Sequence, residues 1–158
     1  SLALSLIGLW FIGGDPDTRK CNQVGLFMSL TSMALSNLVV SLINIAYYKP
    51  RPFDNAELDV SLLFYQPTDS SFPANSIAAS MGIAATVWTI NRFIGSIMLL
   101  IVSLYAFSRI YVGIHYPFDI VAGVAIGGVM TLIVVRLRIL IEPLPTWVIK
   151  AMRLICIA

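Results

Sequence analysis

Residues 93–135 read FIGSIMLLIVSLYAFSRIYVGIHYPFDIVAGVAIGGVMTLIVV. Two apolar runs, 93–108 and 118–135, lie on either side of a short polar stretch, and only Arg109 and Asp119 are charged. A helix that spans a bilayer needs about 20 predominantly apolar residues, with some tolerance. The stretch therefore predicts two membrane spans joined by a short polar connection.

The composition of the whole chain agrees with a membrane protein. Of 158 residues, 58% are hydrophobic and 11% are charged, and the mean hydropathy is +0.88. A water-soluble domain of this length needs a far more polar surface. The length allows one domain, residues 1–158, in which lipid replaces part of the aqueous surroundings.

Further apolar segments extend the predicted bundle. Residues 22–48 carry no charge at all, and residues 74–90 are uncharged and rich in small side chains. Residues 1–13 are apolar but short, and we expect them to be the tail of an incomplete span. Residues 146–158 predict either an interfacial amphipathic helix or a truncated span. The expected fold is an all-α transmembrane bundle of about six helices, the first incomplete.

Small residues recur at helical spacing within two of these segments. Gly123 and Gly127 form a GxxxG pattern, and Ala78, Gly82 and Ala85 form a small-residue face. Small residues let helix backbones approach closely in membranes. Both patterns therefore predict helix packing and no chemistry.

Alternation of the spans divides the charged residues between two sides. One side carries the basic residues Arg19, Lys20, Arg92, Arg136 and Arg138. The other carries Lys49, Arg51 and Arg109 with the acids Asp54, Glu57, Asp59 and Asp69. The positive-inside rule makes the first side cytoplasmic. We therefore expect loop 49–73 on the extracytoplasmic face of an inner or plasma membrane. Its acids either overhang a site at the outer ends of the spans or form only a solvated loop face, and we favour the second interpretation.

Polar residues at the ends of the spans meet on this second side. Six of them converge there: Arg51, Asn75, Ser76, Arg109, His115 and Asp119. Taken singly, each has a structural explanation, such as helix capping or a long side chain that reaches the interface. Together they indicate a functional site, because polar groups in spans are expensive and usually functional.

The spacing of these residues favours phosphate as the ligand. His115 and Asp119 are four residues apart, so we expect them to share a helix face. The carboxylate would accept from one imidazole nitrogen and leave the other free as a base or nucleophile. A guanidinium at Arg109 suits phosphate oxygens, and a helix that begins at Asn75 favours an anion.

Three short segments resemble the motifs of the type 2 phosphatidic acid phosphatase (PAP2) superfamily. Residues 108–119, SRIYVGIHYPFD, resemble its third motif, in which SR, five residues, H, three residues and D follow one another. Residues 49–53, KPRPF, resemble the end of the first motif, and residues 71–76, SFPANS, resemble the second.

The resemblance implies a catalytic scheme. His115 would attack phosphorus and form a phosphohistidine, with Asp119 orienting it. Arg51 and Arg109 would hold the phosphate, beside Asn75 and Ser76 of the second motif. No metal or other cofactor is implied, and the net charge of +2 makes nucleic acid an unsuitable partner.

The chain departs from the family pattern at three positions. Asn44 stands where the first-motif Lys belongs, Ala74 replaces the second-motif Ser, and Ser76 replaces the second-motif His. In the family that His is the general acid, a role typically worth about 10²–10⁴-fold in rate. A lipid phosphate that leaves from a diphosphate is already a stable anion and needs the proton less than an alkoxide does.

Two functions from different classes therefore stay open. The first is a membrane lipid phosphatase that prefers a polyprenyl diphosphate and acts on the outer face. The second is a catalytically impaired relative that serves as a binding or structural subunit of a membrane complex. A transporter has weaker support, because the sequence lacks the paired broken helices typical of that class.

Overall fold

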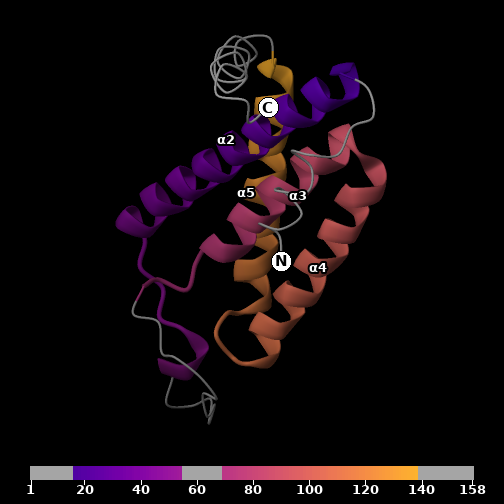
Figure 1. The fold of residues 1–158 in the computed structure, drawn as a ribbon. Helices are drawn as coiled ribbons and strands as arrows, with labels where there is room; N and C mark the ends of the chain where they lie inside the picture. The colour runs from indigo at the N-terminus through magenta and orange to yellow at the C-terminus, as the bar shows by residue number, and fades with distance from the viewer. Residues whose placement is uncertain (1–15, 55–68, 139–158) are drawn as a thin grey trace, which may run out of the picture.

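The computed structural model describes residues 16–54 and 69–138, and all of their regular structure is helical (Figure 1). The elements are α2 (Pro16–Ala46), the 3-10 turn η1 (Pro52–Asp54), α3 (Asn75–Ile90), α4 (Arg92–Tyr111) and α5 (Pro117–Arg136). This confirms the all-α class expected from the sequence. The predicted terminal segments, residues 1–13 and 146–158, lie outside the described residues.

Helix α3 is the centre of the bundle, because it packs against α2, α4 and α5 (Figure 1). Its apolar residues contribute to two clusters. Ile83, Ala84 and Val87 pack with Met98 and Val102 of α4. Nearer the other end, Ala74 and Ile77 pack with Ala106 of α4 and Ile120 of α5. Helix α3 therefore positions its neighbours relative to one another.

Two glycines of α5 allow it to approach α3 backbone to backbone. A Cβ atom added to Gly123 would lie 2.8 Å from the carbonyl oxygen of Ala74, and one added to Gly127 would lie 2.6 Å from that of Ala78. Real Cβ atoms essentially never come that close. The structure thus confirms close helix packing as the reason for this GxxxG pattern.

Hydroxyl groups join three helices close to this contact. Thr131 Oγ1 of α5 lies 3.2 Å from Ser32 Oγ of α2 and 3.3 Å from Thr86 Oγ1 of α3. All three side chains are buried. Hydrogen bonds between polar side chains are a common means of joining helices within a bilayer.

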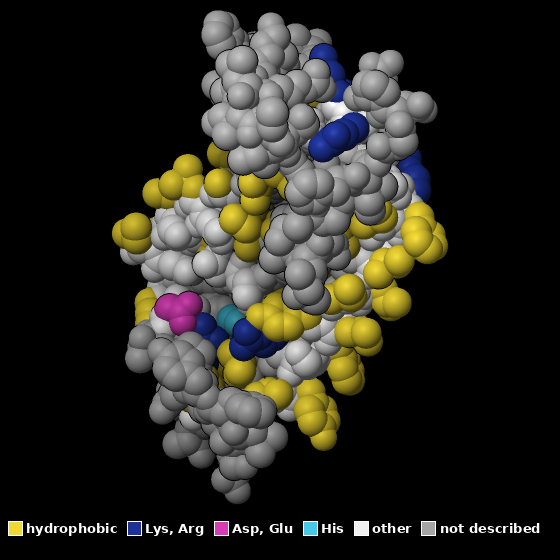
Figure 2. Space-filling view, in the orientation of Figure 1, with side chains coloured by type: hydrophobic (Ala, Val, Ile, Leu, Met, Phe, Trp, Pro, Cys, Tyr) yellow, Lys and Arg dark blue, Asp and Glu magenta, His cyan; other side chains and the backbone are white. Residues whose placement is uncertain are grey.

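Three of the four described α-helices are long and apolar enough to cross a membrane: α2 from Arg19, α4 and α5. Their large hydrophobic side chains face outward, as Figure 2 shows in yellow along the flank of the bundle. Examples are Leu38, Leu42, Leu100, Leu104, Val121 and Leu132. This outward apolar surface matches a lipid environment.

The expectation of about six helices is not confirmed by the described ranges, which contain four α-helices. The segment predicted as a span at residues 74–90 is a helix, α3, but a short one. Helix α3 has 16 residues, which at 1.5 Å per residue is about 24 Å, less than the roughly 30 Å hydrocarbon core. Its uncharged, small-residue sequence reflects burial between other helices. Hydropathy alone does not separate such a helix from a span.

In Figure 1 the C-terminus of α4 and the N-terminus of α5 lie at the lower end of the bundle, and the C-terminus of α2 and the N-terminus of α3 lie higher and to the left. The chain that follows α2 pairs there with the chain that precedes α3. Ser71 N donates to Lys49 O at 2.9 Å, and Lys49 N donates to Ser70 Oγ at 3.1 Å. Between α4 and α5 the chain turns at Gly113, whose φ of 73° suits glycine.

The glycine contact yields a stability prediction with a neighbouring control. We expect Gly127→Ala to destabilise the fold by about 1–3 kcal/mol, because the new methyl group meets α3 backbone that has little room to move. Gly128→Ala should be neutral or slightly stabilising, since its Cβ meets nothing within 4 Å. Thermal unfolding of both variants in detergent compares them. Equal unfolding temperatures would show that the α3–α5 contact is loose.

Candidate active site

A pocket of about 310 Å³ opens between the start of α3 and the end of α4. Its lining comes from every described α-helix except α5 and from the connecting segments: Asn37, Arg51, Asp69, Asn75, Ser76, Arg109, Ile114 and His115. Figure 2 shows basic, acidic and histidine side chains side by side at this level, amid apolar surface. Five of the six predicted site residues thus share one pocket, and the sixth, Asp119, lies behind it. Ser108 points elsewhere, and its hydroxyl donates to Tyr105 O at 2.7 Å.

His115 is buried and held in one orientation. It precedes Tyr116, the N-cap of α5, and its Nδ1 lies 3.0 Å from the carbonyl oxygen of Ser71. A carbonyl accepts only, so the neutral ring carries its proton on Nδ1. The lone pair on Nε2 then lies on the pocket side, 3.4 Å from Arg51 Nη1. This is the arrangement that a nucleophilic imidazole needs.

The surroundings of His115 keep it uncharged. Burial is the largest cause that lowers its pKa, followed by the positive charge of Arg51, and Arg109 adds to the same effect. The hydrogen bond to the Ser71 carbonyl and the Asp119 carboxylate act in the opposite direction. Together they lower the pKa of His115 from 6.5 to about 4. A lowered pKa means that the neutral form persists to lower pH, so the imidazole is uncharged at neutral pH, and its Nε2 accepts a hydrogen bond from Arg51 Nη1.

The prediction of a direct hydrogen bond between His115 and Asp119 is wrong. Helix α5 begins at Pro117, so His115 lies before the helix and the two residues share no helix face. Asp119 is the third residue of α5, and its carboxylate turns back toward the N-cap. It accepts from Lys49 Nζ at 2.7 Å, Ser71 Oγ at 2.5 Å and Tyr116 N at 3.1 Å.

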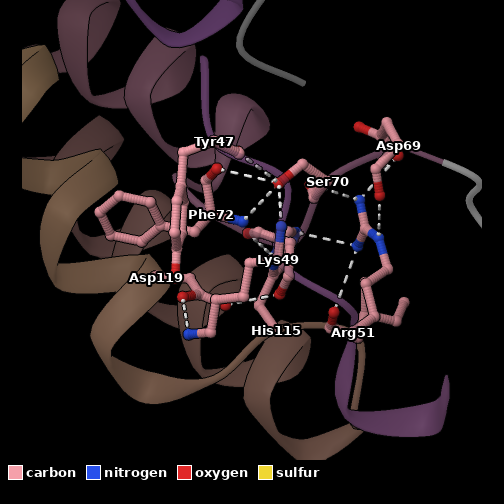
Figure 3. Close-up of polar contacts among 10 residues, drawn as sticks. Tyr47, Lys49, Arg51, Asp69, Ser70, Phe72, His115 and Asp119 are labelled. Atoms are coloured by element: carbon pink, nitrogen blue, oxygen red, sulfur yellow. Dashed lines mark hydrogen bonds and ion pairs between the residues drawn. The ribbon is translucent and has the colours of Figure 1, made fainter. Parts of the chain in front are cut away.

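Arg51 is buried at the pocket and makes several contacts (Figure 3). Its Nη1 donates to Ile114 O at 3.2 Å, and its Nε donates to Asp69 O at 3.0 Å. Its Nη2 forms an ion pair with Asp69 Oδ1 at 2.7 Å. The interpretation of Asp69 as only a solvated loop acid is therefore wrong, although its side chain is 62% exposed. The side chains of Asp54, Glu57 and Asp59 lie outside the described residues.

Two buried polar atoms in the pocket lack a hydrogen-bond partner among the described residues: Arg109 Nε and Asn75 Oδ1. Leaving such a group unpaired costs about 1–3 kcal/mol, so both atoms mark a place for a polar ligand. Arg109 is held in position by Tyr105, one turn earlier on α4, whose hydroxyl accepts from Nη2. The guanidinium also lies 4.8 Å from the centre of the Tyr105 ring.

The start of α3 adds a further attraction for an anion. The residue before the helix, Ala74, gives no side-chain cap to the first turn. Asn75 and Ser76 therefore bring the positive end of the helix dipole to the pocket wall. Ser76 stands at the position of the family's general acid, and the sequence contains one histidine, His115. No second imidazole in these 158 residues replaces that acid.

The sequence analysis missed four residues of the site: Asn37, Lys49, Ser71 and Asp69. Asn37 is a polar residue within the uncharged run of α2, a signal that the sequence does contain. Lys49 is charged and lies in the segment that resembles the first motif, but five residues after Asn44, the position at which that motif has its Lys. Ser71 begins the segment that resembles the second motif and Asp69 is one of the loop acids, but the sequence does not reveal their partners, which depend on how the two connecting segments pair in space.

Comparison with known proteins agrees with this geometry. The sequence profile of the PAP2 superfamily matches residues 25–140. The chain belongs to this superfamily. It is also 30% identical over 149 residues to undecaprenyl-diphosphatase BcrC of Bacillus subtilis, a match that covers 94% of this chain and 73% of the relative. The lipid A 1-diphosphate synthase of Escherichia coli is 28% identical over 150 residues, with 91% and 61% covered.

Solved structures show the same fold. LpxE of Aquifex aeolicus superimposes with a TM-score of 0.66 at 28% identity, covering 85% of this chain and 76% of that one. A transmembrane PAP2-type phosphatidylglycerolphosphate phosphatase from Bacillus subtilis gives a TM-score of 0.57 at 19% identity, with 84% and 64% covered. With its three apolar helices and these transmembrane relatives, this PAP2 protein is integral to a membrane.

The lowered pKa of His115 predicts an unusual pH dependence of its reactivity. Diethyl pyrocarbonate acylates only neutral imidazole, so the rate should hold as the pH falls from neutral and reach half its maximum near pH 4, against 6.5 for an ordinary histidine. The ultraviolet absorbance of carbethoxyhistidine reports this single histidine, and His115→Gln supplies the blank. A midpoint near 6.5 would show that the ring is solvated and not held as described.

Proposed function

We propose that this protein is a membrane lipid phosphatase that hydrolyses a polyprenyl diphosphate through a phosphohistidine intermediate. The observation that carries the proposal is the position of His115 Nε2, which lies on one pocket with Arg51 and Arg109. An unprotonated imidazole nitrogen between two guanidinium groups suits attack on a phosphoryl group.

The first step transfers the terminal phosphoryl group to the protein. The Nε2 lone pair forms a bond to phosphorus while the bond from phosphorus to the bridging oxygen breaks. The electron pair of that bond leaves with the lipid monophosphate. Arg51 and Arg109 stabilise the charge on the equatorial oxygens, and the N–H groups at the start of α3 contribute to the same effect.

The second step frees the enzyme. Water attacks phosphorus, the bond from phosphorus to Nε2 breaks, and inorganic phosphate leaves. The imidazole recovers its lone pair, and the proton released by water goes to phosphate or to solvent. Because the Ser71 carbonyl keeps the other proton on Nδ1 throughout, the ring returns to the tautomer from which it started.

Ser76 supports a diphosphate as substrate. A serine hydroxyl does not protonate a leaving alkoxide at neutral pH, whereas a lipid monophosphate leaves as a stable anion without that proton. Two relatives carry the name undecaprenyl-diphosphatase, one of them covered over 73% of its length by this chain. Their names agree with the preference that Ser76 suggests.

The basic residues support an extracytoplasmic site. Arg19, Arg92 and Arg136 lie at the helix ends opposite the pocket, together with Lys20 and Arg138. By the positive-inside rule that end faces the cytoplasm. The pocket then opens on the outer side, where the headgroups of lipids in the outer leaflet reach it.

Phosphate release from purified protein tests the proposal directly. We expect release from a polyprenyl diphosphate to exceed release from phosphatidic acid by on the order of 10²-fold or more, the range assigned to a missing general acid. Ser76→His should raise the rate on phosphatidic acid more than the rate on the diphosphate. Equal or reversed wild-type rates would contradict the preference.

Trapping of the intermediate tests the mechanism separately. Acid-labile, alkali-stable label from a diphosphate carrying radioactive terminal phosphate should appear on the wild-type chain and be absent from His115→Gln. The opposite outcome is a protein that neither becomes labelled nor releases phosphate from any lipid, and that stays folded but inert as Ser76→His. That outcome would favour the alternative function, a binding or structural subunit of a membrane complex.

A further inference from the structure

One densely bonded group near the site, the carboxylate of Asp119, does not line the pocket. The Asp119 carboxylate is fully buried, and three donors from different parts of the chain surround it. They are Lys49 from the segment after α2, Ser71 from the segment before α3, and the backbone N–H of Tyr116 at the start of α5. Asp119 thus joins the three segments that surround His115.

Lys49 faces away from the phosphate position. Its Nζ lies 2.7 Å from Asp119 Oδ1 and 4.3 Å from the centre of the Tyr116 ring, with the Phe72 ring at 5.8 Å (Figure 3). It is absent from the lining of the pocket. The positive charge of Lys49 therefore neutralises a buried carboxylate. Such a carboxylate strongly destabilises the fold when it is left without a partner.

Ser71 connects this ion pair to the histidine. Its hydroxyl donates to Asp119 Oδ2 at 2.5 Å, and its own carbonyl oxygen lies 3.0 Å from His115 Nδ1. Two backbone bonds fix the segment further, from Ser71 N to Lys49 O at 2.9 Å and from Ala74 N to Asp119 O at 3.2 Å. The acceptor that sets the tautomer of His115 is thus held in place by Asp119.

We propose that Lys49 and Ser71 are positioning residues for the histidine, and that Asp119 acts on His115 through Ser71 instead of by direct contact. Lys49 neutralises Asp119, Asp119 fixes the Ser71 hydroxyl, and the Ser71 carbonyl fixes the imidazole. The part of this inference that concerns turnover rests on the proposed phosphatase function. The part that concerns the orientation of His115 stands without it.

The inference differs measurably from a role for Lys49 in binding phosphate. A phosphate ligand acts mainly on substrate affinity, so its loss raises KM. A positioning residue acts on the alignment of the nucleophile, so its loss lowers kcat while KM changes little. Misplacement of a reacting group by about 1 Å costs on the order of 10²-fold.

Steady-state kinetics on a polyprenyl diphosphate separates the two. We expect Lys49→Met to lower kcat on the order of 10- to 100-fold, with KM nearly unchanged, and Lys49→Arg to restore most of the rate. Ser71→Ala keeps the carbonyl and should lower kcat less. Lys20→Met, which removes an exposed lysine near the start of α2, is the matched control and should behave as wild type.

A double-mutant cycle tests whether Lys49 works through Asp119. Asp119→Asn removes the charge that Lys49 neutralises, so Lys49→Met should cost little more in that background. The double variant should also unfold at a higher temperature than Lys49→Met alone, because no unpaired buried carboxylate remains. Additive losses in kcat, or a rise in KM with kcat unchanged, would overturn the inference in favour of phosphate binding.

Acylation of His115 by diethyl pyrocarbonate supplies a readout that needs no turnover. Lys49→Met and Ser71→Ala should each change the acylation rate at His115 at neutral pH several-fold, while Lys49→Arg and Lys20→Met should match wild type. Variants are compared only when they elute as folded protein in detergent and unfold cooperatively. Wild-type acylation rates in both Lys49→Met and Ser71→Ala overturn the inference, whether or not the protein proves to be a phosphatase.

Discussion

The buried carboxylate of Asp119 is the constraint on which the site depends. At zero exposure it needs its full set of donors, and it obtains them from Lys49, Ser71 and the start of α5. Meeting that requirement draws together segments that are 22 or more positions apart in the chain. The pocket forms beside this junction because the carbonyl of Ser71 and the ring of His115 meet there.

The rest of the bundle serves the same junction. Backbone contact between α5 and α3 at Gly123 and Gly127 fixes the position of α5 along α3. It therefore also fixes where Asp119, at the start of α5, meets the chain before α3. Burial of α3 between three neighbours explains why so short a helix is uncharged and rich in small residues. Its half-buried start then supplies the positive end of a helix dipole at the wall of the pocket, at Asn75 and Ser76.

Within the pocket, one carboxylate faces two guanidinium groups. Asp69 pairs with Arg51, while Arg109 Nε and Asn75 Oδ1 have no partner among the described residues. One guanidinium therefore has an unpaired N–H group, whereas the other is already engaged by an acid.

The sequence by itself determined the membrane class, the helical fold and five of the pocket residues, because hydropathy and the motif spacing around His115 are local properties of the chain. Only the tertiary structure decided that α3 is a buried short helix, since burial depends on neighbours. It also decided the partners of Asp119. Spacing suggested a shared helix face with His115, but the helix begins two residues after the histidine. The carboxylate instead accepts hydrogen bonds from Lys49 and Ser71, which are too far away in the sequence for spacing to predict the contact.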